Sequence, residues 1–144
     1  MPNDQTDAKL LTLLAENARM PVATLARRLG LARTTVQARL EKLETNGTIA
    51  GYTVRLGASQ TPQLRATVLL SVEPRSSAAV LARLKPLPQV RKVHTASGRF
   101  DLIASIAAKT TEELDAVLDH IGEVPGVRAS ESLIHLSTKL DRTS

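Results

Sequence analysis

The sequence predicts an α+β protein, with a winged helix-turn-helix in its first half and a βαββαβ domain in its second. The stretch 21–47 places apolar residues at helical spacing on both sides of a glycine. The stretch 64–138 runs twice through the order strand, helix, strand. The chain has 144 residues, 42% of them hydrophobic, which is enough for two small domains. We expect domains at 1–56 and 64–144, joined by a linker at 57–63.

The first predicted helix covers about residues 7–18. Asp4 or Thr6 is suited to cap its N-terminus, and Asp7 in the first turn favours the helix dipole. Four leucines form its apolar stripe: Leu10, Leu11, Leu13 and Leu14.

Two short helices joined by a tight turn are predicted for residues 21–47. Gly30 separates them, because glycine adopts the left-handed backbone of a helix end, and Asn46-Gly47 ends the second helix. Both helices carry apolar residues at helical spacing: Val22, Leu25, Ala26, Leu29, Val36, Leu40 and Leu43. The other sides of the second helix are polar and basic, which is typical of a helix that enters the major groove of DNA.

A glycine and alternating β-branched residues follow these helices at positions 48–56. This pattern predicts a short hairpin, the wing of a winged helix-turn-helix. The polar stretch 57–63 contains glycine and proline and is predicted to be the linker.

The second half is predicted to hold strands at 64–72, 90–96, 101–107 and 127–138, with helices at 76–84 and 110–121. Ser76 or Ser77 is suited to cap the first of these helices, and Thr110 forms a capping box with Glu113 at the second. Right-handed crossovers then give a ferredoxin-like, four-stranded antiparallel sheet with both helices on one face.

Apolar residues are expected on both faces of this sheet. On the first strand Val68, Leu70 and Val72 alternate with Leu69 and Ser71, and on the last strand Leu133 and His135 alternate with Ile134 and Leu136. Apolar residues on both faces of a half-covered sheet favour a second copy packed against it. We therefore expect a homodimer, and the alternative is that the first domain folds back over the sheet.

Positive charge is concentrated in the first half. Six basic residues lie from Arg19 to Lys42 with Glu41 as the one acid among them, so the rest of this +5 chain is close to neutral. Such a cluster on a helical module is typical of phosphate contacts, although a solvated basic face is the common alternative. The only aromatic residues are Tyr52 and Phe100, too few to stack single-stranded bases. The predicted partner is double-stranded DNA.

The candidate DNA-binding residues fall into two groups. At the start of the second helix of the pair, Arg33 suits guanine and Gln37 suits adenine, and the same face carries Thr34, Thr35 and Ala38. Phosphate contacts are expected from Arg27, Arg28 and Lys42. Arg39 has two readings, as a DNA contact or as a structural ion pair with Glu16 or Glu44.

Several classes of protein are disfavoured. The chain has no cysteine, no apolar run of the roughly 20 residues that cross a bilayer, and a polar start unlike a secretory signal. His94, His120 and His135 lack metal-ligand spacing, and neither a P-loop nor a GxSxG motif is present. We expect a cytoplasmic protein without enzymatic activity, metal, cofactor or membrane partner.

With both halves laid out, the chain resembles the leucine-responsive/asparagine-regulator (Lrp/AsnC) family of bacterial and archaeal transcription factors. In the first half the resemblance rests on residues 7–14 (DAKLLTLL), 17–19 (NAR), 25–31 (LARRLGL), 36–40 (VQARL), 43–44 (LE) and 49–52 (IAGY). In the second half it rests on 97–101 (SGRFD), on 125–127 (PGV) and on the strand that follows. The resemblance implies a transcription regulator with an amino-acid-sensing (RAM-type) second domain, and four dimers assembled into an octameric disc.

The resemblance also implies an effector site on the loop of the SGRFD motif, formed by Gly98, Arg99, Phe100 and Asp101. The residues alone favour a hairpin turn there, with Asp101 able to accept from an α-ammonium group. Weaker candidates are His94, Thr95, Ser130, Ser132 and Ile134.

The chain departs from the family pattern at two places. Alanine stands at Ala32, where the family usually has a capping serine, so the cap is expected to be worse by about 1 kcal/mol. Serines stand at Ser130 and Ser132, where threonine is frequent, and their hydroxyls keep ligand hydrogen bonds possible.

Two other functions remain open at this point. One is a small-molecule-binding or interaction module whose basic helices contact a partner without specific DNA recognition. The other is an RNA-binding sheet, which the shortage of aromatic residues opposes.

Overall fold

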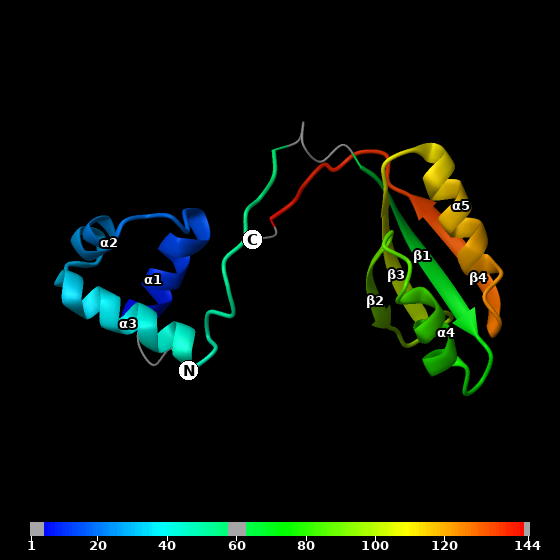
Figure 1. The fold of residues 1–144 in the computed structure, drawn as a ribbon, viewed down its shortest axis with the longest axis horizontal. Coiled ribbons are helices and arrows are strands. Elements are labelled where there is room, and N and C mark those ends of the chain that lie inside the picture. The colour runs from blue at the N-terminus through cyan, green and yellow to red at the C-terminus, as the bar shows by residue number, and fades with distance from the viewer. Residues whose placement is uncertain (1–4, 58–62, 143–144) are drawn as a thin grey trace. The chain divides into compact units, whose positions relative to one another are not determined.

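The computed structural model describes residues 5–57 and 63–142 (Figure 1). Contacts divide the chain into two compact units, the first running to Arg55 and the second spanning Leu56–Asp141. Most of the expected linker, residues 58–62, lies outside the described residues, as does Asp4, one of the two expected caps. Each unit is therefore described by itself.

The first unit contains three helices: α1 (Gln5–Glu16), α2 (Val22–Leu29) and α3 (Arg33–Thr45). Its core consists of Leu10, Leu14, Leu25, Ala26, Val36 and Leu43, and Leu11 and Leu13 pack against it partly buried. The expected core and the helix-turn-helix are confirmed. Thr6 lies inside α1 and is not its cap, because the helix begins two residues earlier than predicted.

Glycine makes the turn between α2 and α3. Gly30 has φ of +69°, and the N–H of Leu31 donates to the carbonyl of Ala26 at 2.9 Å. The same device ends α3, where Gly47 has φ of +82° and the N–H of Ile49 donates to the carbonyl of Leu43 at 2.9 Å. Left-handed glycines at both helix ends confirm the predicted boundaries.

The predicted wing is wrong, because residues 48–57 contain no strand. A strand needs a neighbour that takes up its backbone hydrogen bonds, and alternation along the sequence does not supply one. Instead, Ile49 packs on the helical core, and the hydroxyl of Tyr52 donates to Oε2 of Glu44 at 2.9 Å.

The second unit is a four-stranded antiparallel sheet in the order β2-β3-β1-β4. Its strands are β1 (Leu64–Val72), β2 (Val90–Thr95), β3 (Leu102–Ala108) and β4 (Val127–Ile134), and its helices are α4 (Ser77–Leu84) and α5 (Thr111–Gly122). The predicted ferredoxin-like topology is confirmed. β4 ends four residues before the expected end, because Ala66 pairs with Ile134 and β1 has almost no residues left to pair beyond it.

Both helices cover the same face of this sheet. Val80 and Leu84 of α4 and Val117 and Ile121 of α5 are buried against alternate residues of the two central strands: Ala66, Val68, Leu70, Val72, Leu102, Ala104, Ile106 and Ala108. The intervening residues of β1 and β3 form the face opposite the helices, which we call the open face.

The caps of the two helices differ. Thr110 Oγ1 accepts the N–H of Glu113 at 3.1 Å, as expected. The Glu113 carboxylate accepts from Nε2 of Gln89 at 2.8 Å and from the N–H of Lys109 at 2.9 Å, and these bonds lower the pKa of Glu113. Ser76 stands at the N-cap of α4, but its hydroxyl makes no capping bond, because its backbone is already helical.

Candidate functional site

The start of α3 presents a polar surface held in place by one buried side chain. Val36 is fully buried, and its N–H donates to the carbonyl of Ala32 at 3.1 Å. Ala32 is the N-cap and supplies no side-chain hydrogen bond, as its lack of a hydroxyl requires. The expected base-reading residues are all exposed around this anchor: Arg33, Thr34, Thr35, Gln37 and Ala38.

The residues expected to contact phosphates are also exposed. Arg27 and Arg28 lie in the last turn of α2, and Lys42 lies in the last turn of α3. The last turn of α2 thus carries Arg27 and Arg28 just before the polar start of α3, and Lys42 lies at the far end of α3.

Arg39 forms an ion pair that joins α3 to α1. Its Nη1 donates to Oδ1 of Asp7 at 2.9 Å, and the side chains are 31% and 9% exposed. A structural ion pair was one of the two readings of Arg39, but the partner is Asp7 instead of Glu16 or Glu44. Asp7, which was expected to favour the dipole of α1, thus also links α1 to α3 through a residue 32 positions away in the sequence.

Tyr52 joins the segment after α3 to the exposed side of that helix by a hydrogen bond to Glu44. Partial burial, the hydrogen bond to Glu44 and the negative charge of Glu44 together raise the pKa of Tyr52 above its ordinary value. The contact depends on a neutral phenol, so its contribution to stability is present below the ordinary pKa and is lost as the pH rises through the raised one.

This contact has a direct spectroscopic readout, because Tyr52 is the only tyrosine in the chain. We expect its phenolate absorbance to appear with a midpoint above the ordinary value of about 10. Glu44→Gln should move that midpoint down by removing the charge, whereas Glu41→Gln, also exposed on α3, should leave it unchanged. An ordinary midpoint in the unsubstituted protein contradicts the contact.

The loop of residues 96–101 is tied to the end of β1 by Asp101. Its N–H donates to the carbonyl of Leu70 at 2.7 Å, and its Oδ2 accepts the N–H of Val72 at 2.8 Å. Gly98 has φ of +126° and makes the turn, and the guanidinium of Arg99 lies 5.1 Å from the centre of the Phe100 ring. The turn expected from the residues is present, and one oxygen of the Asp101 carboxylate is committed to it.

A cavity of about 430 Å³ opens beside this loop, at the end of β1. Among the residues expected at the effector site, Arg99 and Asp101 line it. Sequence reasoning missed three charged residues that also line it: Glu73, Arg75 and Arg128. The adjacent strand ends were the available signal, because Val72 pairs with Val127 and so brings the residues that follow them together.

The remaining effector candidates lie elsewhere in the second unit. Ser130, Ser132 and Ile134 are exposed on the edge strand β4, opposite the buried-face residues of β1. Neither they nor Gly98 and Phe100 line the cavity. His94 and Thr95 are exposed on β2, where they pair with Ile103 and Leu102 of β3, and they do not line it either.

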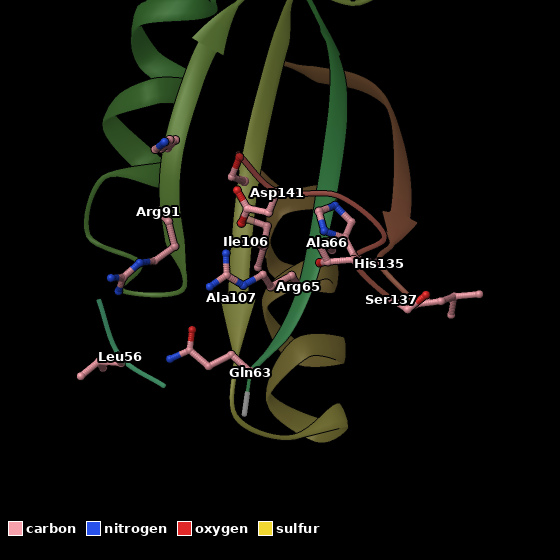
Figure 2. A pocket seen from close by; sticks show the side chains of 14 residues that line it. Leu56, Gln63, Arg65, Ala66, Arg91, Ile106, Ala107, His135, Ser137 and Asp141 are labelled. Atoms are coloured by element: carbon pink, nitrogen blue, oxygen red, sulfur yellow. The ribbon is translucent and has the colours of Figure 1, made fainter. Parts of the chain in front are cut away.

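A larger cavity of about 850 Å³ lies on the open face (Figure 2). Figure 2 shows Arg65, Arg91 and His135 among its lining side chains. Nε2 of His135 lies 2.8 Å from Oγ1 of Thr67, which holds the chain beyond β4 against this face. None of the residues expected at the effector site lines this cavity. Its lining includes several basic side chains, so this part of the open face is cationic.

The described residues form no metal site and no membrane-spanning helix. Residues 5–57 and 63–142 contain no group of three or more histidine or acidic side chains placed to hold a metal ion. In the same part of the chain, no helix is long and apolar enough to cross a membrane.

Comparison with known proteins covers both units. The AsnC-type helix-turn-helix domain matches residues 4–44, and the Lrp/AsnC ligand binding domain matches residues 65–144. The HTH-type transcriptional regulator FL11 of Pyrococcus horikoshii is 30% identical over 148 residues, covering 99% of this chain and 95% of that protein. LrpA of the same organism is 32% identical, covering 86% of this chain and 89% of that protein.

Solved structures agree with this. Escherichia coli AsnC has a TM-score of 0.90 at 24% identity, covering 100% of this chain and 99% of that one, and shows the same fold. A complex of the transcriptional regulator NMB0573 from Neisseria meningitidis with L-Met has a TM-score of 0.85 at 25% identity, covering 96% and 92%. Both domains of a regulator are thus present in one chain, which favours a DNA-binding regulator over a small-molecule-binding or interaction module without specific DNA recognition. The chain belongs to the Lrp/AsnC family and is a DNA-binding transcription regulator with a ligand-binding domain.

Proposed function

We propose that this regulator recognises a specific double-stranded DNA sequence through the start of α3 and changes its occupancy when an amino acid or related small molecule binds the second unit. The observation that carries the first part is the exposed row Arg33, Thr34, Thr35, Gln37 and Ala38 around buried Val36. This regulation takes place in the cytoplasm and involves no membrane.

The contacts to DNA divide by chemistry. Arg33 has a planar guanidinium that matches the two acceptors of guanine, and the amide of Gln37 matches adenine. Arg27, Arg28 and Lys42 bind phosphates and position the helix. Arg39 acts mainly through Asp7, by holding α3 at a fixed angle to α1.

Arg33→Ala is expected to weaken binding to the specific site by about 1–3 kcal/mol, because a bidentate base contact is lost. The measurement is a gel-shift titration against the operator at fixed salt, with a random duplex in parallel. Arg83→Ala removes the same charge from the exposed side of α4 and should leave both affinities unchanged. Equal operator affinity for Arg33→Ala and the unsubstituted protein would show that Arg33 does not read the site.

The effector part rests on the second unit. The related NMB0573 structure is a complex with L-Met, and the cavity beside the loop of residues 96–101 offers charged groups of both signs. We place the effector there, against Arg99 and Asp101, with Gly98 and Phe100 shaping the loop. Ser130, Ser132 and Ile134 lie along the exposed β4 edge, where they are available to a ligand shared with a neighbouring dimer.

The self-association part rests on the open face. Leu69 pairs with Ile103 at its centre, and Leu133 of β4, which is 48% exposed, pairs with Thr67 on the same face of β1. Two copies packed through these residues form a homodimer that presents two recognition helices to a pseudo-palindromic site. Four such dimers form the octamer of this proposal.

Leu69→Asp is expected to convert the dimer into a monomer, because it places a charge at the centre of an apolar contact. Sedimentation velocity of the full chain measures this. Ala82→Asp adds the same charge on the exposed side of α4 and should remain dimeric. If the unsubstituted chain is monomeric at all concentrations, the dimer is wrong.

A further inference from the structure

We propose that the cavity at the end of β1 selects an acidic α-amino acid, a ligand with two carboxylates and one ammonium group. This inference rests on the proposed effector function and names the chemical class of the effector. It is carried by the charges that the cavity brings together: the guanidinium groups of Arg75, Arg99 and Arg128 and the carboxylates of Glu73 and Asp101.

The two carboxylates are already partly engaged, whereas two of the guanidinium groups form no ion pair within the described part of the chain. Glu73 lies 3.7 Å from Arg128, and Oδ2 of Asp101 accepts the N–H of Val72. Within residues 5–57 and 63–142, neither Arg75 nor Arg99 has a carboxylate oxygen within 4 Å. Two guanidinium groups, each matching the two oxygens of a carboxylate, are thus available to a ligand.

The backbone around the cavity supports a built site. Arg75 has φ of +66° and is, in the described part of the chain, the one residue other than glycine with positive φ. Earlier in the same segment, the pairing of β1 with β4 changes register between Ser71 and Val72, which also line the cavity. A strained non-glycine residue and a strand irregularity are features that recur at binding sites.

The loop of residues 96–101 orients Arg99 and supplies Asp101 as a third contact for the ligand. The Arg99 guanidinium is stacked on Phe100, which leaves fewer orientations open to it than a free side chain has. Asp101 keeps its second oxygen, Oδ1, for the ammonium group of the ligand, while Oδ2 maintains the bond to Val72. Two arginines and one aspartate then bind three charged groups of the ligand at once.

The same lining disfavours other amino acids. Among the described residues, Val72 and Pro74 are the apolar ones that line it, and Ser71 and Ser77 add hydroxyls. A long apolar side chain would desolvate a guanidinium group without replacing its hydrogen bonds, and a basic side chain would be repelled by three arginines. A dicarboxylate without an amino group matches the arginines but leaves Asp101 with no partner from the ligand.

Calorimetric titration of the full chain tests this with L-glutamate and L-aspartate against their neutral amides, L-glutamine and L-asparagine. We expect at least one of the acids to bind about tenfold or more tightly than its amide, since one charge-assisted contact is lost. Arg75→Gln and Arg99→Gln should each lower the affinity for that acid about tenfold, and Arg83→Gln, at an exposed position of α4, should not.

Asp101→Asn separates the ammonium contact from the loop, because the amide oxygen still accepts the N–H of Val72. This variant should lower the affinity for the acidic amino acid and leave the affinity for 2-oxoglutarate unchanged. If the amides bind as tightly as the acids, or if L-methionine is preferred, the ligand class is overturned and the effector function stands. If none of these amino acids binds while operator DNA is still bound, the ligand class is overturned, and the effector function is overturned as well if the remaining protein amino acids also fail to bind.

Discussion

Gly126→Ala is expected to destabilise the second unit by about 3–4 kcal/mol. Gly126 has φ of +100°, and an added Cβ would lie 3.0 Å from Cβ of Ser76 and 3.1 Å from Cγ2 of Val80. Backbone strain and overpacking each cost on the order of 1–3 kcal/mol. Val80 is fully buried and cannot move aside, and the Gly126 carbonyl also accepts the N–H of Glu73 at 2.7 Å.

Gly98→Ala is the matched control for this loss. Gly98 has φ of +126°, but no atom lies within 4 Å of the position an added Cβ would take. Gly98→Ala should therefore cost only the strain, about 1–2 kcal/mol. Hydrogen exchange of the β1 and β3 amides measures both losses within the second unit. Equal losses in the two variants would show that the contact with α4 has no effect.

Arg39→Met is expected to destabilise the first unit by about 3 kcal/mol, because it removes the ion-pair partner of the buried Asp7 carboxylate. Asp7→Asn should cost less, because the Arg39 side chain, 31% exposed, still reaches water. Denaturant unfolding followed by the fluorescence of Tyr52 reports on this unit, since the chain has one tyrosine and no tryptophan.

A double-mutant cycle isolates the pair from its surroundings. The combined variant Asp7→Asn with Arg39→Met should be more stable than the sum of the two single losses predicts. Arg28→Met, at an exposed position of α2, removes the same charge and should change stability by less than about 0.5 kcal/mol. Strictly additive losses would mean that the two side chains do not stabilise each other.

Local sequence patterns predicted helices and strands well where burial of one face determines both the pattern and the packing. β1 covers Leu64–Val72 as expected, because its alternation reflects one buried face and Pro74 follows closely. The exposed start of α3 also followed from spacing, since burying Val36 turns its neighbours toward solvent.

Features that depend on distant residues were out of reach of the sequence. The wing required a neighbouring strand, and residues 48–57 have none. The partner of Arg39 depends on how α1 crosses α3, which local charge spacing does not encode. Arg75 joins the cavity through an unusual backbone angle, and Arg128 joins it through the pairing of Val72 with Val127.

The strand order has a consequence for how the chain matures on the ribosome. Every core contact of the first unit is available once residue 49 has been synthesised, so this unit can fold during translation. The central strand β1 has β4 as one neighbour, and β4 ends at Ile134. This side of the earliest strand therefore stays unpaired until β4 has been synthesised, and such an edge is open to mispairing and to binding by chaperones.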